Sequence, residues 1–128
     1  MRLRAALERT VAQRTRARPA PETLYLDLLK QCLTRSIFEE PTTYDPAQRR
    51  HVPFDPDLRA EGRDWPTEAE TMIGLRRLDN LEHCVTDVLR RNVPGDLIET
   101  GVWRGGATIF MRAVLKALTG PRSSVHPG

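Results

Sequence analysis

The chain has 128 residues, of which 39% are hydrophobic, so it has the size of a single domain and can bury a modest core. Its formal net charge of +3 is unevenly distributed, because residues 1–20 carry six arginines against one glutamate and the remainder is slightly acidic. This distribution argues against a nucleic-acid-binding body, and the charges of Arg112 and Lys116 within the most hydrophobic segment argue against a membrane-spanning helix.

Two helical segments are predicted at the start of the chain. Residues 1–20 form a basic arm with apolar residues at helical spacing, for which we expect a frayed or lid-like helix; an organellar transit peptide is the alternative. After Pro21, apolar residues recur at steps of three and four, which predicts a second helix with one apolar face. That face comprises Leu24, Tyr25, Leu28, Leu29, Cys32, Leu33 and Ile37. It must dock against another element.

Residues 39–66 lack this periodicity. Prolines, Asp-Pro pairs and a glycine supply turn signals throughout, so the sequence predicts a long loop. The aspartates in it suit Asx turns rather than a calcium site, because they lack EF-hand spacing. We expect Trp65, near the end of the loop, to anchor it, whereas His51 has no companion that suggests a metal site.

A third helix is expected to begin at Thr67, because Thr67 and Glu70 have the spacing of a capping box. Pro94-Gly95 would end the segment. The apolar seam of this helix comprises Leu78, Leu81, Val85 and Val88. Cys32 and Cys84 fit the apolar stripes of the two helices and form no CxxC pair, so we expect reduced, buried thiols and a cytoplasmic protein.

A strand, a glycine turn and a helix are predicted next. Asp96–Thr100 lies between a Pro-Gly break and the glycines, which favours a short strand, and an apolar helix follows as far as Leu118. The glycines expose N–H groups at the positive end of this helix, where an anion binds well. With Glu99 beside them, these amides match the two charges of an amino-acid moiety, such as the methionine part of S-adenosylmethionine.

The glycine turn is also compatible with alternatives to such a site. An ordinary glycine-bearing strand-to-helix turn would look alike, and Trp103 breaks the GxGxxG pattern of dinucleotide-binding proteins. A nucleotide-binding Rossmann protein is therefore disfavoured. A non-catalytic helical interaction module that uses the arginine arm is a further alternative.

Four stretches resemble the N-terminal half of the macrocin O-methyltransferase family, bacterial enzymes that methylate sugar hydroxyls of natural products. They are "EGRDWP", "TMIGLRRLDNLEHCV", "DVLRRNVPGDLIETGVWRGGATIFMRAVLKA" and, more loosely, "LYLDLLKQCLT", within roughly residues 22–118. The resemblance implies an α/β fold, with N-terminal helices plus the first strand-helix unit of a Rossmann-like methyltransferase and a sheet that is incomplete in this chain. It divides the chain into a basic N-terminal arm (1–20), a helical lid or cap region (21–94, with the long loop at 39–66) and the start of the cofactor-binding domain (95–128).

The resemblance also implies a site for S-adenosylmethionine. Its first motif would comprise Glu99, Thr100, Gly101, Val102, Trp103, Arg104, Gly105 and Gly106. Thr71 and Met72 are expected either to add to the cofactor pocket or to pack at a helix start, and Trp103 to pack under the turn with partial cofactor contact. The implied partners are a glycosylated small-molecule substrate and, for the full-length protein, a homo-oligomer, with no nucleic acid and no membrane.

The family further implies magnesium and a catalytic base, both held by segments beyond the first strand and helix. After Leu118 the residues "TGPRSSVHPG" contain no apolar run for a second strand, and a lone strand would leave its backbone groups unpaired. We therefore expect no catalytic residue and no metal ligand in this chain. We expect the chain to be a truncated fragment that is inactive by itself.

Overall fold

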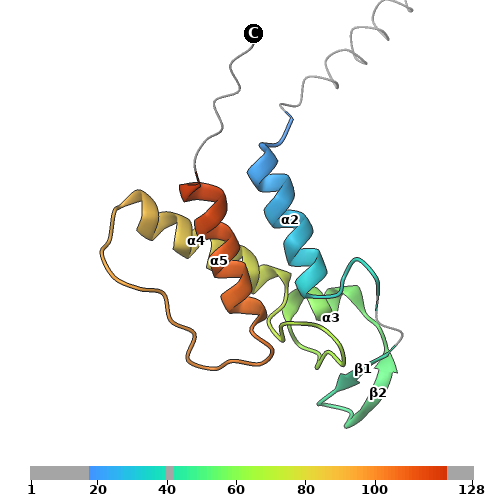
Figure 1. Cartoon of the computed structure of the whole chain (residues 1–128). Coiled ribbons are helices and arrows are strands. Elements are labelled where there is room, and N and C mark those ends of the chain that lie inside the picture. Colours follow the sequence, from blue (N-terminus) through green and yellow to red (C-terminus); the bar gives the residue numbers. More distant parts are fainter. Residues whose placement is uncertain (1–17, 40–41, 121–128) are drawn as a thin grey trace, which may run out of the picture.

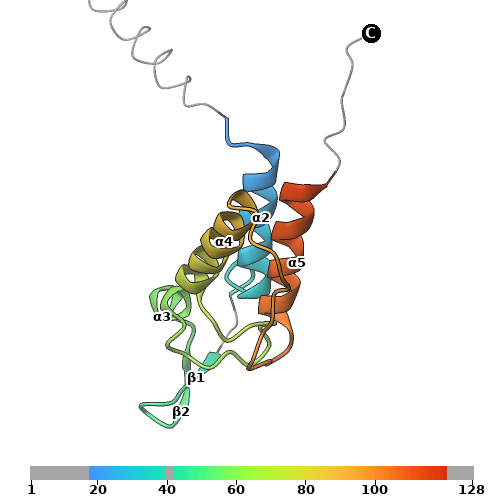
Figure 2. The same ribbon diagram turned by 90° about the vertical axis from the view of Figure 1, so that its left-hand side faces the viewer.

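The computed structural model describes residues 18–39 and 42–120. Three longer helices, α2 (Pro21–Leu33), α4 (Leu75–Arg90) and α5 (Gly106–Thr119), pack side by side. The antiparallel strands β1 (Thr42–Asp45) and β2 (Arg50–Pro53) and the short helix α3 (Pro56–Glu61) lie at one end of these helices (Figures 1 and 2). Residues 1–17 of the predicted arm fall outside the described residues. None of the helices described combines the length and apolar character that a membrane crossing requires.

The hydrophobic core lies between the three longer helices. Helix α5 contributes Phe110 and Val114, which are fully buried and four residues apart, and α4 contributes Leu78 and Val85. Residues at such spacing lie on one helical face, and the apolar seam predicted for α4 is confirmed at Leu78 and Val85. Ile109 lies on the other side of α5 and is about half exposed.

The buried face of α2 differs from the predicted one. Leu26, Lys30 and Leu33 are buried, whereas the expected apolar residues Leu24 and Tyr25 are about half exposed. Leu33 belongs to the predicted face and Leu29 packs against the core, so the prediction was correct in part. It missed Lys30 at the interface with α4, because apolar periodicity does not register a buried charged residue. The result is a helix rotated about its axis relative to the expectation.

Lys30 is stabilised in this position by two carboxylates of α4. Its Nζ lies 2.6 Å from Asp79 Oδ1 and 2.6 Å from Glu82 Oε2. Burial alone lowers the pKa of the Lys30 ammonium, but the hydrogen bonds and charges of the two acids outweigh burial and raise that pKa well above its usual range. The lysine therefore remains charged and joins α2 to α4.

Residues 39–66 were predicted to be a loop, but they contain a hairpin and a helix. Strand β1 pairs with β2 in antiparallel register, with Thr43 opposite Val52 and Tyr44 opposite His51. The expected Asx turns are present where these elements begin and end. Asp45 Oδ1 accepts hydrogen bonds from two backbone amides in the hairpin turn, and Asp55 Oδ1 caps the N-terminus of α3. The aspartates thus mark the ends of short elements.

A buried ion pair holds the hairpin against the helices. The side chains of Arg59 and Asp64 are each 1% exposed, and Arg59 Nη2 lies 2.8 Å from Asp64 Oδ2. Arg59 Nη1 also donates to the carbonyl oxygen of Thr34, at the end of α2, over 2.7 Å. The Thr43 hydroxyl of β1 lies 3.0 Å from Asp64 Oδ2. The pair therefore connects α2, α3 and the hairpin.

Helix α4 begins at Leu75, so the start expected at Thr67 was wrong. The capping box does not form because Glu70 has other partners. Its carboxylate pairs with Arg35 at 2.7 Å, and its backbone N–H donates to the carbonyl oxygen of Leu33 over 3.1 Å. These long-range bonds hold residues 67–74 in a non-helical conformation.

Two further expectations differ from the structure. Asp96–Thr100 forms no strand among the described residues; it belongs to the connection from α4 to α5 that runs outside the helices in Figure 1. A strand requires a neighbour for its backbone groups, and the described residues supply none there.

Cys84 is exposed and Cys32 is partly exposed, so the prediction of two buried thiols was wrong. The proposed division into domains stays a prediction.

Candidate functional site

The glycine turn packs closely against residues 69–71. Gly105 has φ +82°, a left-handed conformation that favours glycine, and it precedes the first residue of α5. The backbone N–H of Gly106 donates to the carbonyl oxygen of Glu70 over 3.0 Å. A Cβ atom on Gly106 would lie 2.5 Å from that oxygen, so the close approach requires glycine at this position.

Glu99 lies at the N-terminus of α5. Its Oε2 accepts hydrogen bonds from the backbone N–H of Thr108, over 3.0 Å, and from the Thr108 hydroxyl. The carboxylate therefore occupies an anion position at the positive end of the helix. The sequence predicted helix amides for an external anion beside a carboxylate, whereas here the carboxylate itself caps the helix.

A cavity of about 550 Å³, which we call the glycine cavity, lies between α4, α5 and the segment before the turn. Three of the predicted cofactor residues line it: Glu99, Thr100 and Gly101. Helices α4 and α5 contribute Arg77, Asn80, Leu81, Cys84, Ala107 and Met111. A Cβ atom on Gly101 would meet no heavy atom of the described residues within 4 Å, so the backbone there borders open space.

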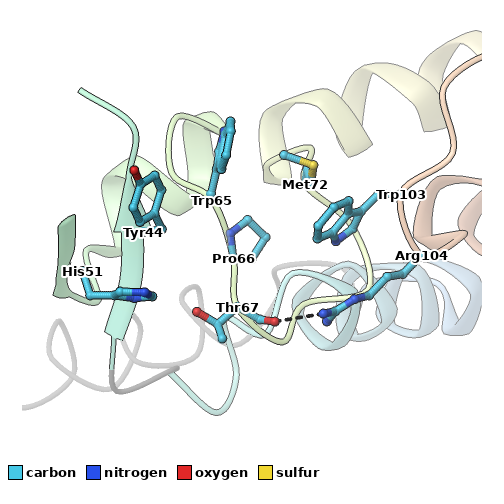
Figure 3. Close-up of a pocket in the computed structure, with 8 residues that line it drawn as sticks. All are labelled: Tyr44, His51, Trp65, Pro66, Thr67, Met72, Trp103 and Arg104. Atoms are coloured by element: carbon cyan, nitrogen blue, oxygen red, sulfur yellow. Dashed lines mark hydrogen bonds between the residues drawn. The ribbon is translucent and has the colours of Figure 1, made fainter. Parts of the chain in front are cut away.

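A second cavity of about 340 Å³, which we call the aromatic pocket, borders the turn at Trp103 and Arg104 (Figure 3). It is lined by Tyr44, His51, Trp65, Pro66, Thr67, Met72, Trp103 and Arg104. The ring centroids of Tyr44 and Trp65 are 5.6 Å apart. Arg104 Nη2 donates to the carbonyl oxygen of Thr67 over 3.0 Å, and its guanidinium lies 5.4 Å from the centre of the Trp103 ring.

The predicted site residues are therefore distributed over two cavities. Met72, Trp103 and Arg104 line the aromatic pocket, whereas Glu99 to Gly101 line the glycine cavity. Thr71 is buried and packs against the first residue of α5. Val102 is exposed and lines neither of these cavities. No helix starts at Thr71 and Met72, and their role at the cofactor stays a prediction.

Sequence reasoning missed Tyr44 and His51, which lie opposite each other in the hairpin. A signal was available: two short runs with β-branched or aromatic residues flank an Asp-Pro turn, which is a pattern typical of a hairpin. Trp65 was expected to anchor the loop. Its backbone exchanges two hydrogen bonds with Tyr44, at 2.9 and 3.0 Å, while its side chain is 52% exposed and lines the pocket.

Metal ligands do not gather in the part of the chain that the structure describes. Within residues 18–39 and 42–120, no group of three or more histidine, cysteine, aspartate or glutamate side chains is arranged to hold a metal ion. The family resemblance implies magnesium ligands beyond the first strand and helix, so we assign no described residue to a metal.

Comparison with known proteins identifies relatives over most of the chain. The family model described as Macrocin-O-methyltransferase (TylF) matches residues 22–126. Demethyldecarbamoylnovobiocin O-methyltransferase from Streptomyces niveus is 50% identical over 95 residues, which are 74% of this chain and 36% of that protein. The 8-demethyl-8-(2,3-dimethoxy-alpha-L-rhamnosyl)-tetracenomycin-C 4'-O-methyltransferase from Streptomyces olivaceus is 56% identical over 96 residues, which are 73% of this chain and 35% of that protein.

A solved structure shows the same similarity. The O-methyltransferase NovP has 46% sequence identity and a TM-score of 0.68, and the match covers 79% of this chain and 39% of that one. The chain thus spans little more than a third of the length of these proteins. Its described elements correspond to part of an α/β methyltransferase fold. Because the family model matches residues 22–126, the chain belongs to the macrocin O-methyltransferase family.

Proposed function

We propose that this chain is the N-terminal part of an S-adenosylmethionine-dependent O-methyltransferase that acts on a sugar hydroxyl of a natural product, and that it holds part of the cofactor. Membership of the family implies use of S-adenosylmethionine. The names of the relatives support a glycosylated acceptor, since one of them methylates the 4'-oxygen of a rhamnosyl tetracenomycin. Mycinamicin III 3''-O-methyltransferase from Micromonospora griseorubida, 51% identical over 94 residues, supports the same substrate class.

One observation supports the proposal for the cofactor: the carboxylate of Glu99 is held in place next to a glycine turn whose backbone borders open space. Thr108 holds Glu99 through its N–H and hydroxyl, so the charge is oriented before any ligand binds. Nearby in the sequence, a Cβ atom built on Gly101 or on Gly105 would meet no heavy atom of the described residues within 4 Å. A ligand with an ammonium group can therefore approach the turn closely and meet a negative charge.

The residues present fit the amino-acid part of S-adenosylmethionine. In the proposed arrangement Glu99 receives the ammonium group, Thr100 and Gly101 contact the chain of the ligand, and Met72 and Trp103 cover the reacting side of the turn. When bound, the sulfonium group supplies the methyl group for transfer. The task of this chain is then to hold the donor in line with the acceptor and to exclude water. We assign no step to magnesium.

The proposal is tested by titrating S-adenosylmethionine into the chain in an isothermal calorimeter. The Glu99→Gln variant should weaken binding about tenfold, because an amide replaces a charge-assisted partner of the ammonium group. Glutamine still offers an oxygen to Thr108, so the circular dichroism spectrum should not change. Asp96→Asn, which neutralises an exposed acid in the same connection, is the matched control and should bind like the parent.

Two results would count against the proposal. If the chain binds no S-adenosylmethionine, it does not hold the cofactor as described. If Glu99→Gln and Asp96→Asn have the same affinity, Glu99 is not part of the site. That the chain transfers no methyl group by itself stays a prediction, which transfer of labelled methyl groups to glycosylated acceptors would test.

A further inference from the structure

The aromatic pocket has the walls of a ligand site. Its aromatic side chains come from three separate parts of the chain: Tyr44 and His51 from the hairpin, Trp65 from the segment after α3, and Trp103 from the glycine turn. Trp65 and Trp103 are 52% and 50% exposed, although each borders the same concave surface. Large aromatic residues left half exposed around a cavity mark a surface that a planar apolar group can cover.

The pocket also has a defined charge. Arg104 is the lining residue with a permanent positive charge, and the residues that line the pocket include no carboxylate. Within the described part of the chain, its polar partners are the carbonyl oxygens of Thr67, at 3.0 Å, and Ala69, at 3.5 Å. These bonds and the stacking on Trp103 fix the guanidinium in place without neutralising it. An acidic group of a ligand would supply the missing counter-charge.

The volume limits the size of the group. About 340 Å³ lies near the lower end of the range for small-molecule sites, roughly 300–1,000 Å³. A fused bicyclic ring fits within such a space, whereas a macrocycle does not. A cationic group is disfavoured by Arg104.

We propose that the aromatic pocket binds a planar aromatic group that carries an acidic substituent, with the ring between Trp65 and Trp103 and the acid at Arg104. This proposal rests on the proposed function, because it assigns the group to the non-sugar part of the methyl acceptor. The pocket and the glycine cavity share one turn, since only Val102 separates Thr100 and Gly101 of the glycine cavity from Trp103 and Arg104 of the aromatic pocket. A bound aglycone would thus place its sugar beside the methyl donor.

The test compares four probes by calorimetry on the unmodified chain: 2-naphthoate, the neutral 2-naphthamide, the cationic 2-naphthylmethylamine and the non-planar cyclohexanecarboxylate. We expect 2-naphthoate to bind at least about tenfold more tightly than each of the others, as a charge-assisted bond combined with stacking requires. Equal affinities for 2-naphthoate and 2-naphthamide would overturn the assignment of an acidic ligand, and absence of binding by both would overturn the ligand site.

Two further measurements locate the binding. The sequence has two tryptophans, and both line the pocket, so their indole N–H resonances report on it directly. Both resonances should shift on titration with 2-naphthoate; binding that shifts neither would overturn the proposal. In Arg104→Gln the preference for naphthoate over naphthamide should fall below about twofold, while the control Arg112→Gln, on the exposed side of α5, should keep it. A preference that survives in Arg104→Gln would remove Arg104 from the site.

Titration of S-adenosylmethionine into the same samples separates this inference from the proposed function. If S-adenosylmethionine binds and 2-naphthoate does not, the acceptor assignment fails and the proposed function stands. If 2-naphthoate binds and S-adenosylmethionine does not, the pocket stands as a ligand site, but its assignment to a methyl acceptor is overturned.

Discussion

Replacing Asp64 by asparagine would leave the Arg59 guanidinium buried without its counter-charge. Both side chains are 1% exposed, and Arg59 Nε lies within 3.1 Å of both carboxylate oxygens. Asparagine keeps the shape, but its NH₂ group would face a donor where an acceptor is needed. Removing one partner of a buried ion pair costs about 3–5 kcal/mol. Since a domain is stabilised by only about 5–15 kcal/mol, we expect Asp64→Asn to lose about 3 kcal/mol, a large share of the total.

Urea unfolding followed by tryptophan fluorescence measures this loss, because Trp65 is the neighbour of Asp64. Asp57→Asn, which neutralises an exposed acid of α3, is the control and should change the free energy of unfolding by less than about 0.5 kcal/mol. The double variant Arg59→Met/Asp64→Leu removes both charges and should be less destabilised than Asp64→Asn alone. The reasoning is refuted if Asp64→Asn lowers the free energy of unfolding by less than about 1 kcal/mol. It is also refuted if the loss in the double variant equals the sum of the losses in Arg59→Met and Asp64→Leu measured separately.

Three other substitutions test the packing and the site. A methyl group on Gly74 would lie 2.5 Å from the carbonyl oxygen of Arg59. Gly74→Ala should therefore lower the free energy of unfolding by about 2–3 kcal/mol in urea titrations. An unchanged value would show that the backbone at Gly74 and at Arg59 moves apart easily. Gly101→Ala meets no atom of the described residues within 4 Å, so it should keep stability within about 0.5 kcal/mol yet weaken S-adenosylmethionine binding in calorimetry; unchanged affinity would take Gly101 out of the site. Lys30→Met leaves two α4 carboxylates without their cation and should cost about 1–2 kcal/mol. The pKa of Lys30 is raised in the folded state, so its contribution to the free energy of unfolding is complete below the usual lysine pKa of about 10.4. This contribution is lost only as the pH rises through the higher pKa of the folded state. The difference in free energy of unfolding between Lys30→Met and the parent should therefore be constant from about pH 7 to pH 9.

Local signals in the sequence predicted the features that depend on neighbouring residues. The glycines at 105 and 106 predicted the turn before α5, and the apolar run after them predicted the helix itself. Asp45 and Asp55 were expected to form Asx turns, and both accept backbone amides two and three residues ahead. These features need no information from distant parts of the chain, so a single sequence is enough to find them.

Competition between distant groups explains the errors. A capping box at Thr67 would have been adequate locally, but Arg35 binds the Glu70 side chain and Leu33 accepts from its backbone. The same holds for α2, where carboxylates of α4 make it favourable to bury Lys30. In both cases a partner more than thirty residues away in the chain decides the outcome, and periodicity contains no information about it.

The strand expected at Asp96–Thr100 shows the same limit in another form. Pairing with a neighbour, and not composition, makes a strand, so the segment lies outside the helices with Ile98 82% exposed. Its position still brings Glu99 to the N-terminus of α5, because that contact is made by Thr108, nine residues later. The charged residue of the proposed cofactor site is therefore placed by the helix cap, independently of any sheet.

The aromatic pocket depends on a contact that no motif indicated. Asp64 accepts the Thr43 hydroxyl, and the residues that follow them, Trp65 and Tyr44, exchange two backbone hydrogen bonds. The position of two pocket walls is thus set by the buried ion pair that Asp64 forms with Arg59. The stability of the hairpin and the shape of the aromatic pocket consequently both depend on this ion pair. The family motif located the turn with Trp103 and Arg104, whereas the opposite wall could be found only once the register of the hairpin was known.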